Sequence, residues 1–320
     1  MGFKLTAPLW TAEFIFHGTG NSGSVPNIEC LTATLGDHDQ PCRTCHAALT
    51  PEGRKNRRRN TGAIIRLRRQ NGTEMTVVID VGKNFRESAL EWFTKYGLRK
   101  IDAVLLTHAH ADAVNGLDDL RVEHGRIFPI PNTTHNSTPA SSHLNTPSSN
   151  LLPPIHFGER KPSDGLPYFS MGFVLVDIVY ISDVSHIPDY TWDWILAVKN
   201  MQYTALIVDC LRIKPHISHF GLAQAVATAR KLGAQRTYMV GFSHEILHDD
   251  WERLGKYFQN SRTITPSHGD TNHTITKAVE DIPKEPSVWI RPAYDGLRFL
   301  WDSNGVIQDL NSEFNDNELG

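Results

Sequence analysis

Short apolar runs recur along the chain, and several of them end in a cluster of polar residues. The run EFIFHG at 13–18 leads into a Gly-rich turn, and the alternation over 62–82 predicts a β-hairpin that turns at Asn71-Gly72. Further apolar runs predict buried strands over 101–106, 172–183, 204–209 and 236–240. The spacing of turn residues between these runs indicates short strands joined by compact connections.

Segments with helical periodicity separate the predicted strands. The segment 84–97 is amphipathic and closes at Gly97, a residue type that commonly ends a helix. The segment 219–233 predicts a second helix, and 116–125 predicts a third. Strands that alternate with helices are typical of the α/β class.

The domain organisation follows from where this periodicity stops. The segment at about 128–167 is dominated by Pro, Ser, Thr and Asn and has no period, which predicts a mobile insertion. Residues 306–320 look like a flexible tail. We therefore expect a single domain over 1–305 that carries the insertion.

Composition narrows the functional classes. The chain has 320 residues, 40% of them hydrophobic, and a net charge of −3, so we expect a soluble protein with no overall attraction to nucleic acid or membrane. No apolar run approaches the roughly 18 residues that span a bilayer, and no signal pattern opens the chain. We expect a cytoplasmic or a nuclear and cytoplasmic protein. The segment MGFKLT at 1–6 matches a myristoylation pattern. This pattern is too unspecific to predict that the chain is lipidated.

Polar residues gather at the carboxyl ends of the predicted strands, where α/β folds build their sites. His108, His110 and Asp112 follow one strand at every second position. Two imidazoles at this spacing can share a metal ion, and Asp112 could reach a second ion. A solvated polar loop is the alternative, but a His-x-His-x-Asp pattern after a buried strand favours metal binding. Asp183, Asp209 and His244 end three other strands.

The chain has four cysteines, too few and too scattered for a disulfide framework. Cys42 and Cys45 form a CxxC pair, with Cys30 upstream, so these three thiols either bind metal or are simply buried. Cys210 lies alone in an apolar run and is expected in the core.

At this point the sequence resembles the metallo-β-lactamase fold, whose signature loop is similar to LLTHAHADAVNGLDDLR. The resemblance is strongest to the branch that contains the phosphoribosyl 1,2-cyclic phosphate phosphodiesterase of phosphonate degradation and its eukaryotic relatives. It covers about residues 12–300, and the matching motifs occur in the order of that branch: GTGNSGSVP, CRTC, NRRRNTGAIIR, VIDVG, YISDVSHIP, HFGLAQAV, GFSHE and AYDGL. The resemblance implies an α/β architecture, an αββα sandwich of two sheets flanked by helices, with a metal site along one edge.

Some of the ligands implied by the resemblance are present and others are missing. His108, His110 and Asp112 match ligands of the family, and Asp183 matches the aspartate that bridges two metal ions. Three histidines of the family are replaced here, by Ala113, by Asp164 and by Gly241. Asp164 could still supply an oxygen ligand.

The remaining set suits one metal ion better than two. His108, His110, Asp183 and Asp164 make a plausible catalytic zinc site. The second position, at Asp112 and Asp183, would be weak, empty or filled by a harder ion such as Mn²⁺. The resemblance implies metal-assisted attack of water on phosphorus, with Asp112 and His219 as catalytic residues. His219 matches a histidine that can donate a proton to the leaving group, and helix capping is its structural alternative.

The resemblance also gives the cysteines an assignment. The related phosphodiesterases hold a structural zinc with three cysteines and one histidine, and Cys30, Cys42, Cys45 and His244 match those positions. His46 is a competing fourth ligand, and buried thiols without metal are the other alternative.

The function implied by these residues is hydrolysis, with a small phosphorylated molecule as the partner. We expect a metal-dependent phosphodiesterase acting on a small cyclic or ribosyl phosphate, with zinc and, at the catalytic site, manganese as candidate cofactors. One alternative is a weak or inactive relative that binds or regulates, and another is a hydrolase of thioesters, lactones or nucleic acid. The charge balance speaks against a large RNA substrate. A homodimer is one possible oligomeric state. One arginine of the basic run 54–60 could face the phosphate, but the sequence does not identify which.

Overall fold

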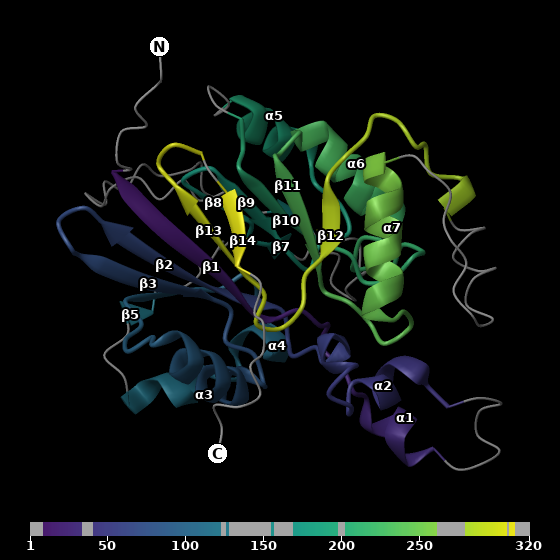
Figure 1. The fold of residues 1–320 in the computed structure, drawn as a ribbon, viewed down its shortest axis with the longest axis horizontal. Helices are drawn as coiled ribbons and strands as arrows, with labels where there is room; N and C mark the ends of the chain where they lie inside the picture. The colour runs from purple at the N-terminus through teal and green to yellow at the C-terminus, as the bar shows by residue number, and fades with distance from the viewer. Residues whose placement is uncertain are drawn as a thin grey trace, which may run out of the picture.

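Two β-sheets lie face to face, and helices cover the outer face of each (Figure 1). The computed structural model describes residues 9–33, 41–122, 126–127, 155–156, 169–197, 202–260, 279–305 and 307–310. The four layers are an αββα sandwich, which confirms the α/β prediction from the sequence.

The first sheet has seven strands in the order β14-β13-β1-β2-β3-β4-β5. Its strands pair antiparallel, except that β3, β4 and β5 run parallel to one another. Their bounds are β1 Trp10–Gly18, β2 Gly62–Arg69, β3 Glu74–Ile79, β4 Ala103–Leu105, β5 Arg126–Ile127, β13 Arg298–Asp302 and β14 Ile307–Leu310.

The second sheet has five strands in the order β12-β11-β10-β9-β8. All of them are parallel except β8, so the carboxyl ends of β9, β10 and β11 meet at one edge. The bounds are β8 Phe173–Leu175, β9 Ile178–Ile181, β10 Ala205–Asp209, β11 Arg236–Val240 and β12 Ile290–Pro292. A separate pair consists of β6 Ile155–His156 and β7 Phe169–Ser170.

The helices fall into two outer layers and one N-terminal group (Figure 1). The helix α3 covers the first sheet, and α5, α6 and α7 cover the second. Short helices α1, α2 and α4 lie at the loops, together with 3₁₀ turns at Arg54–Asn56 and Leu117–Val122. The bounds are α1 Ile28–Thr32, α2 Arg43–Ala47, α3 Phe85–Tyr96, α4 Ala111–Val114, α5 Asp189–Ala197, α6 Leu222–Leu232 and α7 His248–Asn260.

The alternation along β1 explains the layering. Phe14 and Phe16 point into the space between the sheets, while Ile15, between them, packs on the helical side with Trp92 of α3. Phe14 stacks on Phe299 at a centroid distance of 5.1 Å. Burial of each such side chain contributes about 1.5–3 kcal/mol, so the aromatic core holds the two sheets together.

Several local predictions are confirmed. The hairpin of β2 and β3 turns at Asn71-Gly72, where Gly72 has a φ of 78°. The helix α3 ends at Gly97 in the left-handed conformation, with a φ of 62°. Cys210 is fully buried in the core.

Two elements differ from the expectations. Residues 307–310 of the expected tail form β14, because Gly305, with a φ of 72°, closes a turn after Asp302 and lets the chain return along β13. The helix expected over 116–125 is a 3₁₀ turn at Leu117–Val122.

Other expectations fall largely outside the described residues. Most of the insertion at 128–167 lies there, although 155–156 form β6. Among the residues that the structure describes, no helix is both long and apolar enough to cross a membrane.

Candidate metal centre and active site

The signature loop follows β4 and brings three candidate ligands together. One ligand atom from each of His108, His110 and Asp112 lies within 4.8 Å of the other two. His108 is 3% exposed, whereas His110 is exposed on the rim. Nitrogen and carboxylate donors this close are a suitable set for a divalent metal ion.

A hydrogen-bond chain fixes the ring of His108. The carboxylate of Asp80 accepts from the backbone N–H of Thr107 at 2.8 Å and from the Thr107 hydroxyl at 2.7 Å. Because the hydroxyl gives its single proton to Asp80, its oxygen accepts from Nδ1 of His108, 2.8 Å away. Nε2 then faces Asp112, with 3.8 Å to Oδ1. This tautomer leaves Nε2 as the atom for a metal ion.

The charges around His108 favour a cation at this place. Burial lowers the pKa of His108, but the hydrogen bond to Asp112 and the charges of Asp183 and Asp80 outweigh it and raise the pKa to about 9. Burial also raises the pKa of Asp80 to about 7. A metal ion would neutralise the same carboxylates that here stabilise the imidazolium.

Asp183 enters the site from the other sheet, directly after β9. Its backbone has a φ of 52°, and Asp80 has a similar value of 58°. Left-handed backbone at a non-glycine residue costs about 1–3 kcal/mol and persists where the surroundings fix it, which is common at functional sites. Burial raises the pKa of Asp183 above its usual range, and the negative charges of Asp209 and Asp112 act in the same direction.

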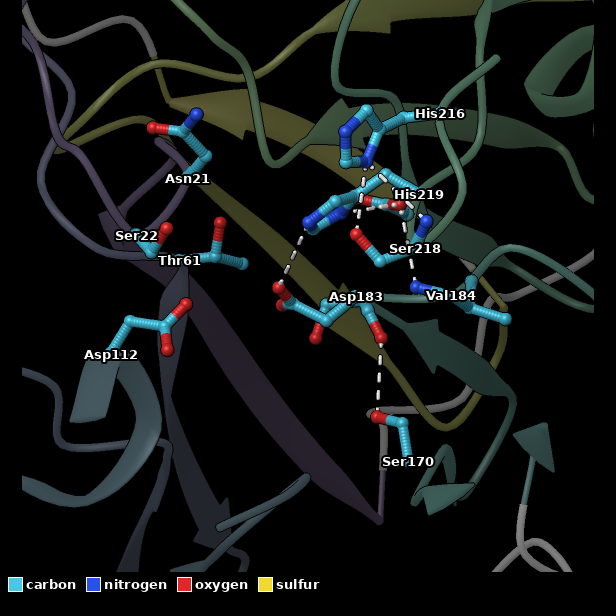
Figure 2. Close-up of polar contacts among 12 residues, drawn as sticks. Asn21, Ser22, Thr61, Asp112, Ser170, Asp183, Val184, His216, Ser218 and His219 are labelled. Atoms are coloured by element: carbon cyan, nitrogen blue, oxygen red, sulfur yellow. Dashed lines mark hydrogen bonds and ion pairs between the residues drawn. The ribbon is translucent and has the colours of Figure 1, made fainter. Parts of the chain in front are cut away.

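His219 is held by the carboxylate of Asp209 at the end of β10. Nδ1 of His219 lies 3.0 Å from Oδ2 of Asp209, which also accepts from the backbone N–H of Phe220 at 2.9 Å. Nε2 of His219 therefore points at Asp183, 3.9 Å from Oδ1 (Figure 2). Burial lowers the pKa of His219, but the charge and hydrogen bond of Asp209 raise it to about 9. A protonated imidazole in this orientation is a proton donor.

The contacts of His219 also bear on the alternative that it caps a helix. The N-cap of α6 is Gly221, whose backbone N–H donates to Gln224 at 2.9 Å, so His219 does not cap the helix. The role of Asp209 was missed in the sequence, where its strand-end position was the only signal.

The backbone and the packing at position 241, where the resemblance implies a histidine, suit a glycine. Gly241 has a φ of 83°, and a Cβ added there would lie 2.4 Å from Oδ1 of Asp209. A side chain at 241 would therefore displace the carboxylate that holds His219. Ala113 is 1% exposed, and its carbonyl oxygen accepts from the backbone N–H of Val81 at 2.8 Å. Asp164, the remaining candidate ligand, lies outside the described residues.

A second cluster forms where the N-terminal loop meets the end of β11. Nδ1 of His244 lies 3.1 Å from the sulfur of Cys30, 3.4 Å from that of Cys42 and 3.7 Å from that of Cys45. The four ligand atoms lie within 4.8 Å of one another, while His46 is exposed and outside the group. Burial raises the pKa of Cys45 to about 12, and a bound cation would favour the thiolate form of this sulfur.

Two arginines of the basic run 54–60 are held by protein groups. Arg58 is 1% exposed and donates to the carbonyl oxygens of Ser243 and Ile246, on either side of His244. Arg59 pairs with Glu91 at 2.6 Å. Both guanidinium groups therefore act as structural clamps.

Comparison with known proteins agrees with the fold. The family model described as the beta-lactamase superfamily domain matches residues 75–155. The octanoyltransferase of Porphyromonas gingivalis is 26% identical over 321 aligned positions, which cover 92% of this chain and 53% of that protein. The chain thus spans about half the length of this curated relative.

Two solved structures are similar over almost the whole chain. A diphosphatase from the PhnP family has a TM-score of 0.57 and 21% identity, covering 94% of this chain and 99% of that one. Zn²⁺-bound PqqB from Methylobacterium extorquens has a TM-score of 0.53 and 14% identity, covering 89% and 99%. The chain is therefore a protein of the metallo-β-lactamase fold that resembles enzymes of the PhnP family.

Proposed function

We propose that this protein is a metal-dependent hydrolase that cleaves a phosphodiester bond in a small cyclic or ribosyl phosphate. One observation carries the proposal. Candidate ligands after β4 of the first sheet face a buried carboxylate and a carboxylate-held histidine after β9 and β10 of the second (Figure 2). Metal-assisted hydrolysis needs a metal site and a proton donor arranged in this way.

The residues present fit one divalent ion. His108 and His110 would supply nitrogen and Asp112 would supply oxygen, in keeping with the fixed tautomer of His108. Asp183 lies outside this group, across the site from Asp112 (Figure 2), and would add a carboxylate from the second sheet. When bound, such an ion activates water and polarises a phosphoryl oxygen. We propose zinc for this position. Mn²⁺ is the alternative ion, because carboxylate ligands suit it. The same proposal includes Asp164 as a candidate further oxygen ligand.

In this proposal His219 supplies the proton and Asp209 holds its ring. The carboxylate of Asp209 stabilises the imidazolium and keeps Nε2 directed into the site. Nε2–H can then protonate the leaving oxygen as its bond to phosphorus breaks. Asp183, 3.9 Å from Nε2, keeps the proton donor next to the candidate ligands.

The cysteine cluster has a separate role in this proposal. Cys30, Cys42, Cys45 and His244 are a closed Cys₃His set, which suits a structural zinc ion. The ion would tie the N-terminal loop to the end of β11, next to the strand ends that carry the active site.

Activity and metal content test the proposal together. The purified chain should contain about two zinc equivalents and hydrolyse bis-p-nitrophenyl phosphate with added Mn²⁺. Asp183→Ala should abolish hydrolysis, while Asp193→Ala, an exposed aspartate on α5, should leave it unchanged. A panel of cyclic ribose phosphates then identifies the substrate. Metal-loaded protein without hydrolysis of any diester would refute the phosphodiesterase and favour one of the alternatives, a binding or regulatory protein or a hydrolase of another bond.

A second candidate function comes from the curated relative. Because that protein is named an octanoyltransferase, hydrolysis of a medium-chain acyl thioester is the competing activity. Octanoyl thioester and phosphodiester substrates, assayed side by side with the Asp183→Ala variant, separate the two.

A further inference from the structure

The candidate site is acidic, yet the proposed substrate is an anion. Asp112 and Asp183 lie on opposite sides of the site (Figure 2). Asp80 accepts from Thr107, next to His108, and Asp209 holds His219. A metal ion offsets part of this charge, but recognition of phosphate normally adds a charged donor from the protein. An anionic substrate would therefore need a cationic side chain among the described residues around the site.

Three arginines near the strand ends have partners within the protein. Arg58 donates to two backbone carbonyl groups, and Arg59 pairs with Glu91. Arg212, on the loop that leads to His219, pairs with Glu245 at 3.3 Å. Their charges are therefore used in buried or paired contacts and not directed into the gap.

Lys83 is placed differently, because its backbone is fastened to the loop of candidate ligands. It follows Gly82, where an added Cβ would lie 1.9 Å from the carbonyl oxygen of Asp112. One residue earlier, the N–H of Val81 donates to the carbonyl oxygen of Ala113 at 2.8 Å. Only glycine permits this close approach at position 82, so the backbone of Lys83 starts beside Asp112.

The side chain of Lys83 reaches the Gly-rich loop after β1. Its Nζ lies 2.6 Å from the carbonyl oxygen of Ser22. Figure 2 shows Ser22 and Thr61 on the same side of the gap as Asp112, opposite Asp183 and His219. An ammonium group has three donors, and its partner at Ser22 is neutral, so the positive charge at this wall is not offset by that contact.

A side-chain network keeps this wall in place. Asn84, next to Lys83, accepts from the Ser24 hydroxyl at 2.7 Å and from the backbone N–H of Asn60 at 3.3 Å. The amide of Asn60 donates in turn to the carbonyl oxygen of Asn21 at 3.0 Å. The Gly-rich loop is thus joined to the turn that carries Lys83, and the ammonium group is held at the rim of the site.

We propose that Lys83 binds an anionic oxygen of the substrate and so selects phosphorylated substrates over neutral ones. This inference rests on the proposed function and makes Lys83 a specificity-determining residue of the same site. The expected contact is an ionic hydrogen bond at the rim, which mainly affects substrate binding and not the proton transfer at His219.

The test compares two exposed lysines at opposite ends of β3. Lys83 follows the strand, while Lys100 donates to the carbonyl oxygen of Glu74 at its start, at 3.1 Å. Lys83→Met and Lys100→Met are made in the full chain and loaded with metal, and inorganic phosphate binding is measured by calorimetry. Lys83→Met should weaken binding about tenfold, equivalent to about 1.4 kcal/mol, and Lys83→Arg should restore most of it. Lys100→Met should bind like the unchanged chain.

Kinetics separates this inference from the proposed function. With bis-p-nitrophenyl phosphate, Lys83→Met should raise KM about tenfold and change kcat by less than about twofold. Equal phosphate affinity in Lys83→Met and Lys100→Met would overturn the role of Lys83 even if the protein is an active phosphodiesterase. Phosphate binding that depends on Lys83 without hydrolysis of any diester would support the anion site and refute the proposed activity instead.

Discussion

Replacing Asp209 with asparagine tests the pair at the centre of the site. Asparagine keeps the size of the side chain and can still accept the hydrogen bond from Phe220, which is 2.9 Å long. It removes the negative charge that lies 3.0 Å from Nδ1 of His219. The variant therefore changes the electrostatics of His219 with little change in packing.

The size of the effect follows from the pKa of His219. The rise from 6.5 to about 9 in the metal-free protein corresponds to about 3 kcal/mol, at 1.36 kcal/mol for each pKa unit. Asp209 is the largest of the groups that raise it, and Asp183 and Asp112 contribute the rest, so we assign about 1–2 kcal/mol to Asp209. A histidine with a raised pKa in the folded state stabilises the fold fully below pH 6.5 and loses that contribution as the pH rises through about 9.

Urea unfolding of the metal-free proteins at several pH values measures this contribution. Asp209→Asn should lower the free energy of unfolding by about 1–2 kcal/mol at about pH 6, and the difference should shrink by about pH 9.5. With metal present, kcat/KM for the diester should fall by about 10²–10⁴ while the metal content stays constant. The exposed Asp193→Asn is the control. A difference in stability that is the same at every pH would refute the charge interaction, and unchanged kinetics would refute the proton-donor role.

Three further predictions address other parts of the molecule. Gly241→Ala should lower the free energy of unfolding by about 1–3 kcal/mol, because its φ of 83° and the Asp209 oxygen leave no room for a Cβ; unchanged urea unfolding would contradict this. Cys42→Ser should remove about one zinc equivalent by elemental analysis, whereas Cys210→Ser, at a buried cysteine outside the cluster, should remove none; equal zinc content in both would argue against the Cys₃His site. Phe14→Ala, between the sheets, should cost about 3–5 kcal/mol in urea unfolding, and a loss below about 1 kcal/mol would contradict its place in the core.

Much of the fold could be predicted because its signals are local. The alternation along 62–82 and the Asn71-Gly72 turn specify a hairpin without reference to the rest of the chain. The strand β14 gave no such signal, since its four residues are only half-buried and depend on pairing with β13. Residues 116–125 have helical spacing, but Leu117–Val122 form a 3₁₀ turn, so intrinsic helix propensity did not determine this element.

In the candidate site, too, the residues of one local motif could be predicted, whereas contacts between distant residues could not. His108, His110 and Asp112 stand in one short motif, and the structure brings them together as the spacing predicted. The role of Asp209 depends on His219, ten residues later, and on the glycine at 241 in the neighbouring strand connection. The position of Lys83 depends on its contact with Ser22, 61 residues earlier. Such relations arise only from how the strands and loops pack.

The glycine at 241 also bears on how many metal ions the site can hold. A histidine there would need the space that Oδ1 of Asp209 occupies, so a metal ligand at 241 would require the carboxylate that holds His219 to shift. The pair places a cationic imidazolium 3.9 Å from Asp183 when protonated. A second metal ion bound to Asp183 on that side would repel this charge. The proposed enzyme would therefore work with one metal ion beside His108 and with His219 as its proton donor. Metal analysis of Cys42→Ser, which should leave about one equivalent, tests this directly.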